Sequence, residues 1–173
     1  NSTQASQALI PSISAFIGIS LSPAFSMQLD LPDSNYDFIH FSGSWARERH
    51  LIRTKLRPGL QSVSSLRAAS SAQQNPFIML VRHGSTDDTG EVFGFNLIYS
   101  GSFLDQIEVD QFNTTRILIG INPTEFAWQL DPEQFFQTPE CILSYTDKGM
   151  NKLSQQLAEF YQQHLVSPRF AKE

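Results

Sequence analysis

The most restrictive feature of the chain is a series of short segments in which apolar and polar residues alternate. Met27, Leu29 and Leu31 alternate with Gln28 and Asp30, which puts the apolar side chains on one face of a β-strand. Turn-forming residues separate this segment from similar ones. Further short strands are expected at 38–41, 60–64, 92–99, 103–112, 115–121, 126–130 and 140–145, and the continuous apolar run at 77–81 is consistent with a buried strand. Many short strands at even spacing predict a mainly β protein with an antiparallel sandwich or barrel.

The last segment has a helical period. Its apolar residues recur three or four positions apart, at Met150, Leu153, Leu157, Phe160, Tyr161 and Leu165. This spacing predicts one C-terminal helix over 148–166. Ser144 or Asp147 is the expected N-cap, and Ser167-Pro168 is expected to end the helix.

Charge is distributed unevenly over the 173 residues, a length that fits one domain. The net charge of −5 argues against nucleic acid as a partner. Seven of the twelve basic residues lie between Arg47 and Arg82, where Glu48 is the only acid, and thirteen of the seventeen acids follow position 82. Two interpretations stay open: solvated outer faces of strands, or a cationic face that docks an acidic neighbour.

Other sequence features limit the disulfides, metal sites, cofactor sites and membrane segments that we expect. Cys141 is the single cysteine, so no intrachain disulfide is expected, and it is predicted to be a small buried hydrophobe in a cytoplasmic protein. The four histidines have no partners at metal-ligand spacing, and no cofactor-binding motif occurs. We therefore expect no metal and no cofactor. No run is long and apolar enough for a membrane span, and 8–25 lacks the cationic lead of a signal peptide.

The segment from Ser44 to His50 is the strongest candidate for a special site. Trp45, Arg47 and Arg49 would share one face of a regular strand, where arginine can stack on tryptophan and pair carboxylates bidentately. One interpretation is a domain or subunit contact formed by Trp45, Arg47, Glu48, Arg49 and Arg67. The other is a structural ion-pair network around a packed Trp45, with Glu48 paired to Arg53, Lys55 or Arg67. Trp128 is expected in the core.

An amide-rich loop supplies weaker candidates. Gln73, Gln74 and Asn75 could contact sugar hydroxyls, and they could equally pin loop backbone. The acid pairs are assigned to turns and to an outer strand face, so no catalytic residue is predicted; the pairs are Asp87 with Asp88, Glu108 with Asp110, and Asp131 with Glu133.

Several ordered segments resemble one known family. They read GSWARERH at 43–50, QS at 61–62, SSAQQNPF at 70–77, GEVFGF at 90–95, GINP at 120–123, FAWQL at 126–130, FQTPE at 136–140 and YTDKG at 145–149. In this order they resemble the N-terminal β-domain of bacterial α-galactosidases of glycoside hydrolase family 36. The resemblance runs from about residue 24 to residue 170.

The resemblance implies an antiparallel β-supersandwich fragment at 24–147, the helix at 148–166 and a linker at 167–173. Residues 1–23 do not match and would be an altered or truncated start. In the family a catalytic (β/α)8 barrel follows and holds both catalytic Asp. A barrel needs roughly 250 residues, so none fits in this chain and no catalytic residue is carried over.

The implied function is a non-catalytic part of a retaining α-galactosidase. It would brace the barrel and contribute to homo-oligomer contacts in a cytoplasmic enzyme. The whole enzyme would hydrolyse terminal α-galactosides such as melibiose and raffinose. One alternative is a stand-alone carbohydrate-binding β-sandwich with Trp45 and the 73–75 loop as its platform. Another is an incomplete sandwich that exposes apolar sheet surface.

Two positions depart from the family pattern R-G-x-S-S-H-Q. Ala68 stands where the pattern has glycine, and Ala72 where it has histidine. If the glycine position needs a positive φ, Ala68 carries backbone strain. The missing histidine weakens any polar role of this loop.

Overall fold

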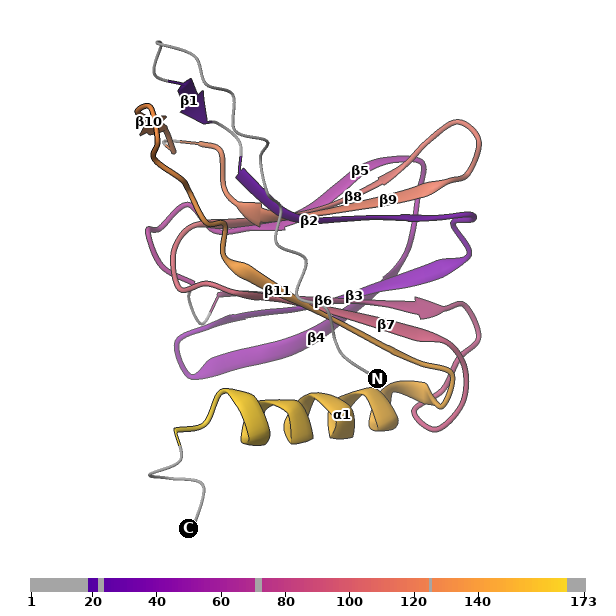
Figure 1. Cartoon of the computed structure of the whole chain (residues 1–173). Helices are drawn as coiled ribbons and strands as arrows, with labels where there is room; N and C mark the ends of the chain where they lie inside the picture. The colour runs from indigo at the N-terminus through magenta and orange to yellow at the C-terminus, as the bar shows by residue number, and fades with distance from the viewer. Residues whose placement is uncertain (1–18, 22–23, 71–72, 125, 168–173) are drawn as a thin grey trace.

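Two antiparallel sheets packed face to face form the body of the molecule, and one helix covers the outer side of one sheet (Figure 1). The computed structural model describes residues 19–21, 24–70, 73–124 and 126–167. The elements are β1 Ile19–Leu21, β2 Ala24–Leu31, β3 Tyr36–Ser44, β4 Arg47–Lys55, β5 Gly59–Ser64, β6 Gln74–Arg82, β7 Val92–Ile98, β8 Phe103–Val109, β9 Thr115–Ile121, β10 Trp128–Leu130, β11 Glu140–Thr146 and α1 Gly149–His164. The predicted mainly β sandwich with a C-terminal helix is confirmed.

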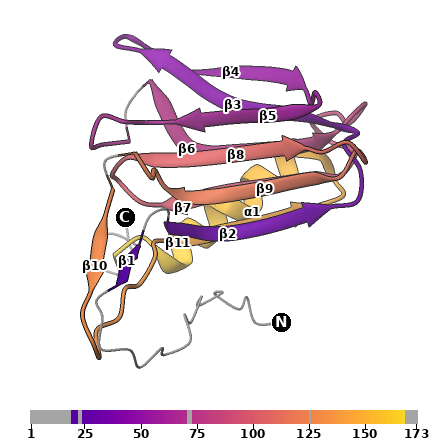
Figure 2. The ribbon, with the colours of Figure 1, turned by 90° about the horizontal axis from the view of Figure 1, so that it is seen from above.

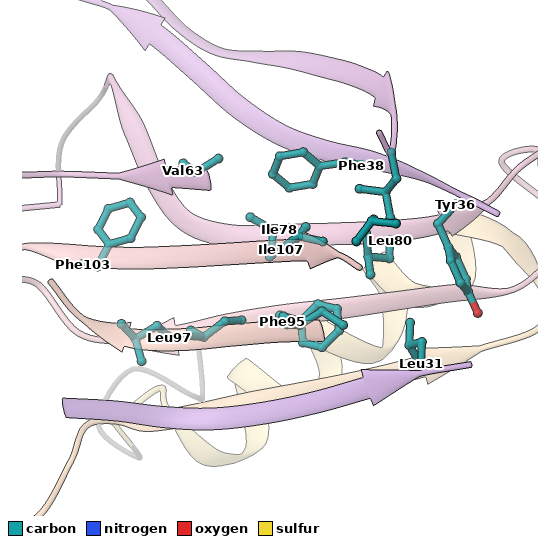
Figure 3. Close-up of a cluster of buried hydrophobic side chains, with 14 residues drawn as sticks. Leu31, Tyr36, Phe38, Val63, Ile78, Leu80, Phe95, Leu97, Phe103 and Ile107 are labelled. Atoms are coloured by element: carbon teal, nitrogen blue, oxygen red, sulfur yellow. The ribbon is translucent and has the colours of Figure 1, made fainter. Parts of the chain in front are cut away.

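The sheets have different sizes and share one core. One has the strand order β11-β7-β6-β3-β4 and the other β2-β9-β8-β5 (Figure 2). Between them, Phe103 and Ile107 from β8 face Phe38, Ile78 and other apolar side chains of the larger sheet (Figure 3). The period-two pattern builds this core, because alternate residues of each strand point inward. β1 and β10 pair only with each other, outside both sheets.

Helix α1 buries the outer face of the five-stranded sheet. Leu153 and Leu157 pack on Ile39, Met79 and other apolar residues of that sheet. β3 and β6 are therefore buried on both faces, which accounts for the unbroken apolar run at 77–81. Gly94 permits the close approach, since a Cβ there would lie 2.7 Å from Leu153 Cδ2. No helix in the described ranges is long and apolar enough to cross a membrane.

The start of α1 differs from the expectation. The predicted Ser144 or Asp147 cap is wrong, because Lys148 is the N-cap and no side chain caps the helix. Instead, the backbone N–H of Asn151 donates to the carbonyl oxygen of Asp87 (2.8 Å), and its side-chain amide donates to Asp88 Oδ1 (2.9 Å). The loop that precedes β7 thus holds the first turn of the helix.

A network centred on Arg82 closes one end of the sandwich. Arg82 donates to Asp33 Oδ1 (2.6 Å), to Glu91 Oε1 (2.8 Å) and to the hydroxyl of Tyr36 (2.6 Å). Its guanidinium carbon lies 4.0 Å from the centroid of the Tyr36 ring, and Tyr36 in turn donates to Glu91 (2.8 Å). Burial, together with its bond to Glu91, raises the pKa of Tyr36. One arginine therefore links β2, β3, β6 and the start of β7.

Asp37 makes a second set of ion pairs beside this network. It accepts hydrogen bonds from Arg53 Nε (2.8 Å) and His83 Nδ1 (2.9 Å). Burial works against ionisation of Asp37, but the bonds from His83 and Arg53 outweigh it and lower its pKa. Arg116 and Asp30 pair near the same end, where β2 finishes and β9 begins (3.0 Å). We call this the ionic end of the sandwich.

The core contains one carboxyl group without a partner. Asp105 is only 1% exposed and lies on the inward face of β8 between Phe103 and Ile107. Neither of its oxygens has a hydrogen-bond partner among the residues that the structure describes. Burial raises its pKa well above the usual value of 3.8. Cys141 packs against the same core, and burial with the nearby Asp105 raises its pKa to about 12.

The raised pKa of Asp105 predicts a loss of stability as pH rises. Above its usual value Asp105 ionises in the unfolded chain but keeps its proton in the folded chain, so the folded state binds more protons there. The unfolding free energy therefore falls from about pH 4 upward until the folded pKa is passed. Asp105→Asn should remove this dependence, so the stability of the variant relative to the parent chain should rise with pH, by roughly 1 kcal/mol per pH unit until the folded pKa of Asp105 is passed.

Urea unfolding of both proteins at pH 4, 6 and 8 measures the effect. Glu108→Gln is the matched control, because Glu108 is an exposed carboxylate on the same strand. A constant difference between the Asp105→Asn variant and the parent chain at all three pH values would contradict the assignment of a protonated Asp105.

Candidate interaction site

All the contact and sugar candidates named from the sequence lie at the end of the sandwich opposite the ionic end. Four connections meet there: the β3–β4 turn, the β5–β6 loop, the β7–β8 turn and the long β9–β11 connection (Figures 1 and 2). The candidates are Trp45, Arg47, Glu48, Arg49, Arg67, Gln73, Gln74 and Asn75. We call this the hairpin end. The C-terminal end of α1 lies at the same end in both views.

The β3–β4 hairpin presents Trp45 to solvent. Trp45 and Ala46 form the turn between the paired residues Ser44 and Arg47, and Trp45 is 91% exposed. Ala46 has φ 64° and Arg49 has φ 58°, and the register shifts between Ser42 and Ser44. A bulge of this kind re-aims side chains. The predicted common face of Trp45, Arg47 and Arg49 on a regular strand is therefore wrong.

The charged side chains near the β3–β4 turn make no ion pairs within the part of the chain that the structure describes. Arg47, Glu48 and Arg49 are exposed, and none of them, nor Arg67, takes part in an ion pair with another described residue. Arg53, one of the expected partners of Glu48, pairs with Asp37 instead. Among the residues that the structure describes, the structural alternative, an ion-pair network around a packed Trp45, is not formed. Arg47 and Arg49 are left available for carboxylates of another molecule or domain.

The amide-rich segment is tied to the hairpin by hydrogen bonds. The backbone N–H of Gly43 donates to the carbonyl oxygen of Gln73 (3.1 Å), and Gln74 Nε2 donates to Ser42 Oγ (3.4 Å). Gln74 and Asn75 begin β6 and are partly buried. Of the two roles open to these amides, the one visible here for Gln74 is the pinning of the β5–β6 loop. Ala72 lies outside the described residues.

The β9–β11 connection carries an exposed aromatic cluster. Trp128 packs on Phe136 (ring centroids 5.3 Å apart), and Phe136 packs on Phe126 (5.9 Å). Trp128 is 47% exposed and Phe135 86% exposed. The expectation that Trp128 is a core residue is wrong, because its strand pairs with β1 outside both sheets. We call residues 126–137 the aromatic arm, which projects beyond the sandwich (Figure 1).

The sequence carries a signal for this arm. Phe126, Trp128, Phe135 and Phe136 fall between Pro123 and Pro139, with Pro132 among them. Proline is disfavoured in central strands, so aromatic residues in such a segment are poor core candidates. The turn of the arm contains two acids, Asp131 and Glu133. The backbone N–H of Gln134 donates to the carbonyl oxygen of Asp131 (3.1 Å), and Glu133 has φ 68°.

Residues of two of the acid pairs form hydrogen bonds that hold local structure. Asp110 accepts the backbone N–H groups of Phe112 (2.8 Å) and Thr114 (2.9 Å) and thereby closes the β8–β9 turn. Asp87 and Asp88 hold the start of α1, as described above. Within the part of the chain that the structure describes, no three His, Cys, Asp or Glu residues are grouped for a metal ion.

The comparisons identify the family. Residues 18–131 match the model of the glycosyl hydrolase family 36 N-terminal domain. The chain belongs to this family. It is 50% identical over 147 residues to the α-galactosidase AgaA of Geobacillus stearothermophilus. The aligned residues cover 85% of this chain and 20% of AgaA.

Solved structures agree with this assignment. The α-galactosidase of Lactobacillus brevis superposes with a TM-score of 0.90 at 68% identity, over 92% of this chain and 22% of that one. A variant of AgaA in complex with raffinose superposes with a TM-score of 0.89 at 47% identity, over 91% of this chain and 22% of the AgaA chain. The chain thus spans about a fifth of the length of the relatives it matches.

The two ends of this family 36 domain differ in how the backbone turns. At the ionic end, positive φ angles fall on residues that tolerate them, namely Gly59, Gly84, Gly90, Asn113 and Gly149. At the hairpin end they fall on Ala46, Arg49, Ala68 and Glu133. Such angles cost roughly 1–2 kcal/mol for an L-residue with a Cβ, and strain of this kind gathers at functional sites. Backbone strain therefore marks the hairpin end independently of charge and exposure.

The strain at Ala68 gives a direct test in the family 36 domain. Its φ of 54° meets the expectation that this position, glycine in the family pattern, needs the left-handed region. Ala68→Gly should raise the unfolding free energy by about 1 kcal/mol, because relief of strain exceeds the added entropy of the unfolded chain. Urea unfolding measures the difference. Ala69→Gly is the matched control and should be neutral or destabilising; an equal effect of both substitutions would contradict the account.

Proposed function

We propose that this chain is the C-terminal part of the non-catalytic N-terminal β-domain of a retaining, cytoplasmic α-galactosidase. The observation that carries the proposal is the family match over residues 18–131, together with relatives named α-galactosidase of which the matched region covers about a fifth. The proposed division is a β-sandwich at 24–147, the helix at 148–166 and a linker at 167–173 toward a catalytic (β/α)8 barrel.

The proposed substrates are terminal α-galactosides such as melibiose and raffinose, hydrolysed by the whole enzyme. The raffinose complex of AgaA supports this class for a relative of this chain. Two carboxylic acids in the barrel would act by double displacement through a covalent intermediate. This domain would supply none of the reacting groups.

The proposed role of the domain is to brace the barrel and to contribute to oligomer contacts through the hairpin end. Exposed Trp45, the unpaired Arg47 and Arg49, and the strained backbone all lie there. Tryptophan and arginine are the residues most enriched at the energetic centres of interfaces. In the proposed enzyme the barrel follows α1, whose C-terminal end also lies at the hairpin end (Figure 1).

Hydrolysis of a chromogenic α-galactoside tests the proposal. We expect no activity from this chain alone and little from a polypeptide that carries only the barrel. Activity should appear, or rise at least tenfold, when the two are mixed. Hydrolysis by the chain alone would contradict the proposal, and so would a barrel polypeptide whose activity does not respond to the chain.

The contact role of the arginines is tested by alanine substitution in the complete enzyme. Arg47→Ala with Arg49→Ala should weaken assembly at least about tenfold, because carboxylates buried against them lose their partners. Arg57→Ala is the matched control, since Arg57 is exposed in the β4–β5 connection at the ionic end. Sedimentation velocity over a concentration series reads the result. Unchanged assembly of the double variant would count against the proposed surface.

A further inference from the structure

We propose that ionisation of Asp105 opens the sandwich along its β11 side, so that the two sheets and helix α1 pack more tightly in acid than at neutral pH. The consequence for the enzyme rests on the bracing role proposed above, because a brace that loosens as pH rises regulates what it supports. Unlike the loss of stability described for the whole fold, this opening is local: one strand moves, and water enters the core from one side.

Apolar side chains surround Asp105 within its own sheet. Its cross-strand neighbours are Val63 on β5 and Ile119 on β9, and both are buried. Phe103 and Ile107, two residues before and after it on β8, are buried as well (Figure 3). None of these side chains can donate a hydrogen bond to a carboxylate. The charged form of Asp105 therefore has no stabilising group in place while the core is closed.

The other elements packed on the core supply no cation for Asp105 among the described residues. Burial is the only cause of its raised pKa, and none of the ion pairs includes it. The other ionisable side chains that border the core are Tyr36, His40, Tyr99 and Cys141. Burial lowers the pKa of His40, against a smaller effect of the Phe41 backbone, and thus favours its neutral form. Ionisation of Asp105 therefore requires water.

The β11 side is where the core is least covered. β11 is an edge strand that pairs only with β7, and it lies against β2, the edge strand of the other sheet (Figure 1). Leu143 and Tyr145, which alternate with the outward residues of β11 as Cys141 does, are exposed. Their neighbours on β7, such as Phe95 and Leu97, are buried. Displacement of β11 breaks one strand pairing and admits water to the core.

Cys141 connects this side of the molecule to Asp105. Its thiol is partly buried and packs against the same core. Burial raises its pKa to about 12, and the charge of Asp105 contributes to the rise, so the two groups lie within electrostatic reach of each other. A movement that uncovers Cys141 should therefore also wet Asp105. Its carboxyl group then ionises at neutral pH, since its pKa in water is about 4, and ionisation stabilises the open form.

The opening reaches helix α1 because β11 leads directly into it. β11 ends at Thr146 and α1 begins at Gly149. On the outer face of the sheet, Ile142 of β11 packs with Leu153 and Leu157 of the helix. A displaced β11 removes part of the surface on which α1 packs. In the proposed enzyme the barrel follows α1, so its attachment to this domain loosens as pH rises.

Labelling of Cys141 by a pyridyl disulfide tests the proposal, because Cys141 is the single cysteine. In the native protein the labelling rate is the product of the opening constant and the reactivity of an exposed thiol. That reactivity rises tenfold per pH unit below the thiol pKa of about 8.5. Ionisation of Asp105 adds a further tenfold per pH unit through the opening constant. Between pH 5 and pH 7 the rate should therefore rise about a hundredfold per pH unit.

Substitutions at Asp105 should remove one of the two factors. Asp105→Asn should show only a tenfold rise per pH unit, because its opening is no longer linked to a proton. Asp105→Leu, which also lacks the carboxyl group, gives a second test with an apolar side chain. Glu108→Gln is the matched control, since Glu108 is exposed on the same strand, and it should keep the hundredfold rise. Circular dichroism checks that every variant is folded.

The parent chain alone can overturn the proposal. A rise of only tenfold per pH unit would show that Asp105 does not ionise when Cys141 is uncovered. The same slope in the parent chain and in both Asp105 variants would exclude Asp105 as the cause of any steeper rise. Low concentrations of urea test whether the opening is local, because a small opening exposes little surface. A labelling rate that responds to urea as steeply as global unfolding would overturn the assignment to β11.

Stimulation of the barrel polypeptide separates this inference from the proposed function. Stimulation by the parent chain should fall relative to stimulation by Asp105→Asn as pH rises from 5 to 8. A chain that stimulates the barrel while its labelling slope is tenfold leaves the proposed function standing and overturns this inference. A chain that shows the hundredfold slope but never stimulates the barrel supports the opening and overturns the proposed function. Equal stimulation by both proteins at every pH would overturn the regulatory consequence.

Discussion

Arg82 is the residue on which the arrangement of this sandwich most depends. Its guanidinium joins Asp33, Glu91 and Tyr36 and so fastens the end of β2, the start of β3, the end of β6 and the start of β7. Partly buried arginine with two carboxylates and a phenol is strongly oriented, because its fork of donors is satisfied in fixed directions. With Asp37, Arg53 and His83 beside it, one end of the molecule is closed by its own charges. Those charges are unavailable to a partner.

The hairpin end differs from the ionic end, because its charged and aromatic groups face solvent. Its cations Arg47, Arg49 and Arg67 make no ion pair with another described residue, its aromatic side chains reach solvent, and its turns hold non-glycine residues at positive φ. Each of these features by itself also occurs on protein surfaces that bind nothing. Their coincidence at one end, with ion pairs and permissive glycines gathered at the other, is what an interaction surface on a rigid scaffold requires. Family 36 membership supplies the context, a domain about a fifth as long as its α-galactosidase relatives.

The sequence predicted those parts of the fold that depend on local periodicity. The strand expected at 115–121 is β9 with the same bounds, and the C-terminal helix follows from its apolar spacing. The predictions that were wrong depend on contacts between residues far apart in the sequence. The start of α1 is built by a loop some 60 residues earlier, through Asp87 and Asp88. Trp128 lies outside the core because its strand leaves both sheets, which alternation within five residues cannot reveal. Asp105 was open to prediction, since it shares the inward face of β8 with Phe103 and Ile107.

Hydrogen exchange of the proposed complete enzyme and of this chain alone tests the central claim most directly, that the hairpin end is where the domain meets its partners. In the complete enzyme the account predicts slower amide exchange at the β3–β4 turn and in the aromatic arm. It predicts no change in the loop between β6 and β7, which the Arg82 network already holds. Slower exchange confined to the ionic end, with the hairpin and the arm unchanged, would contradict it.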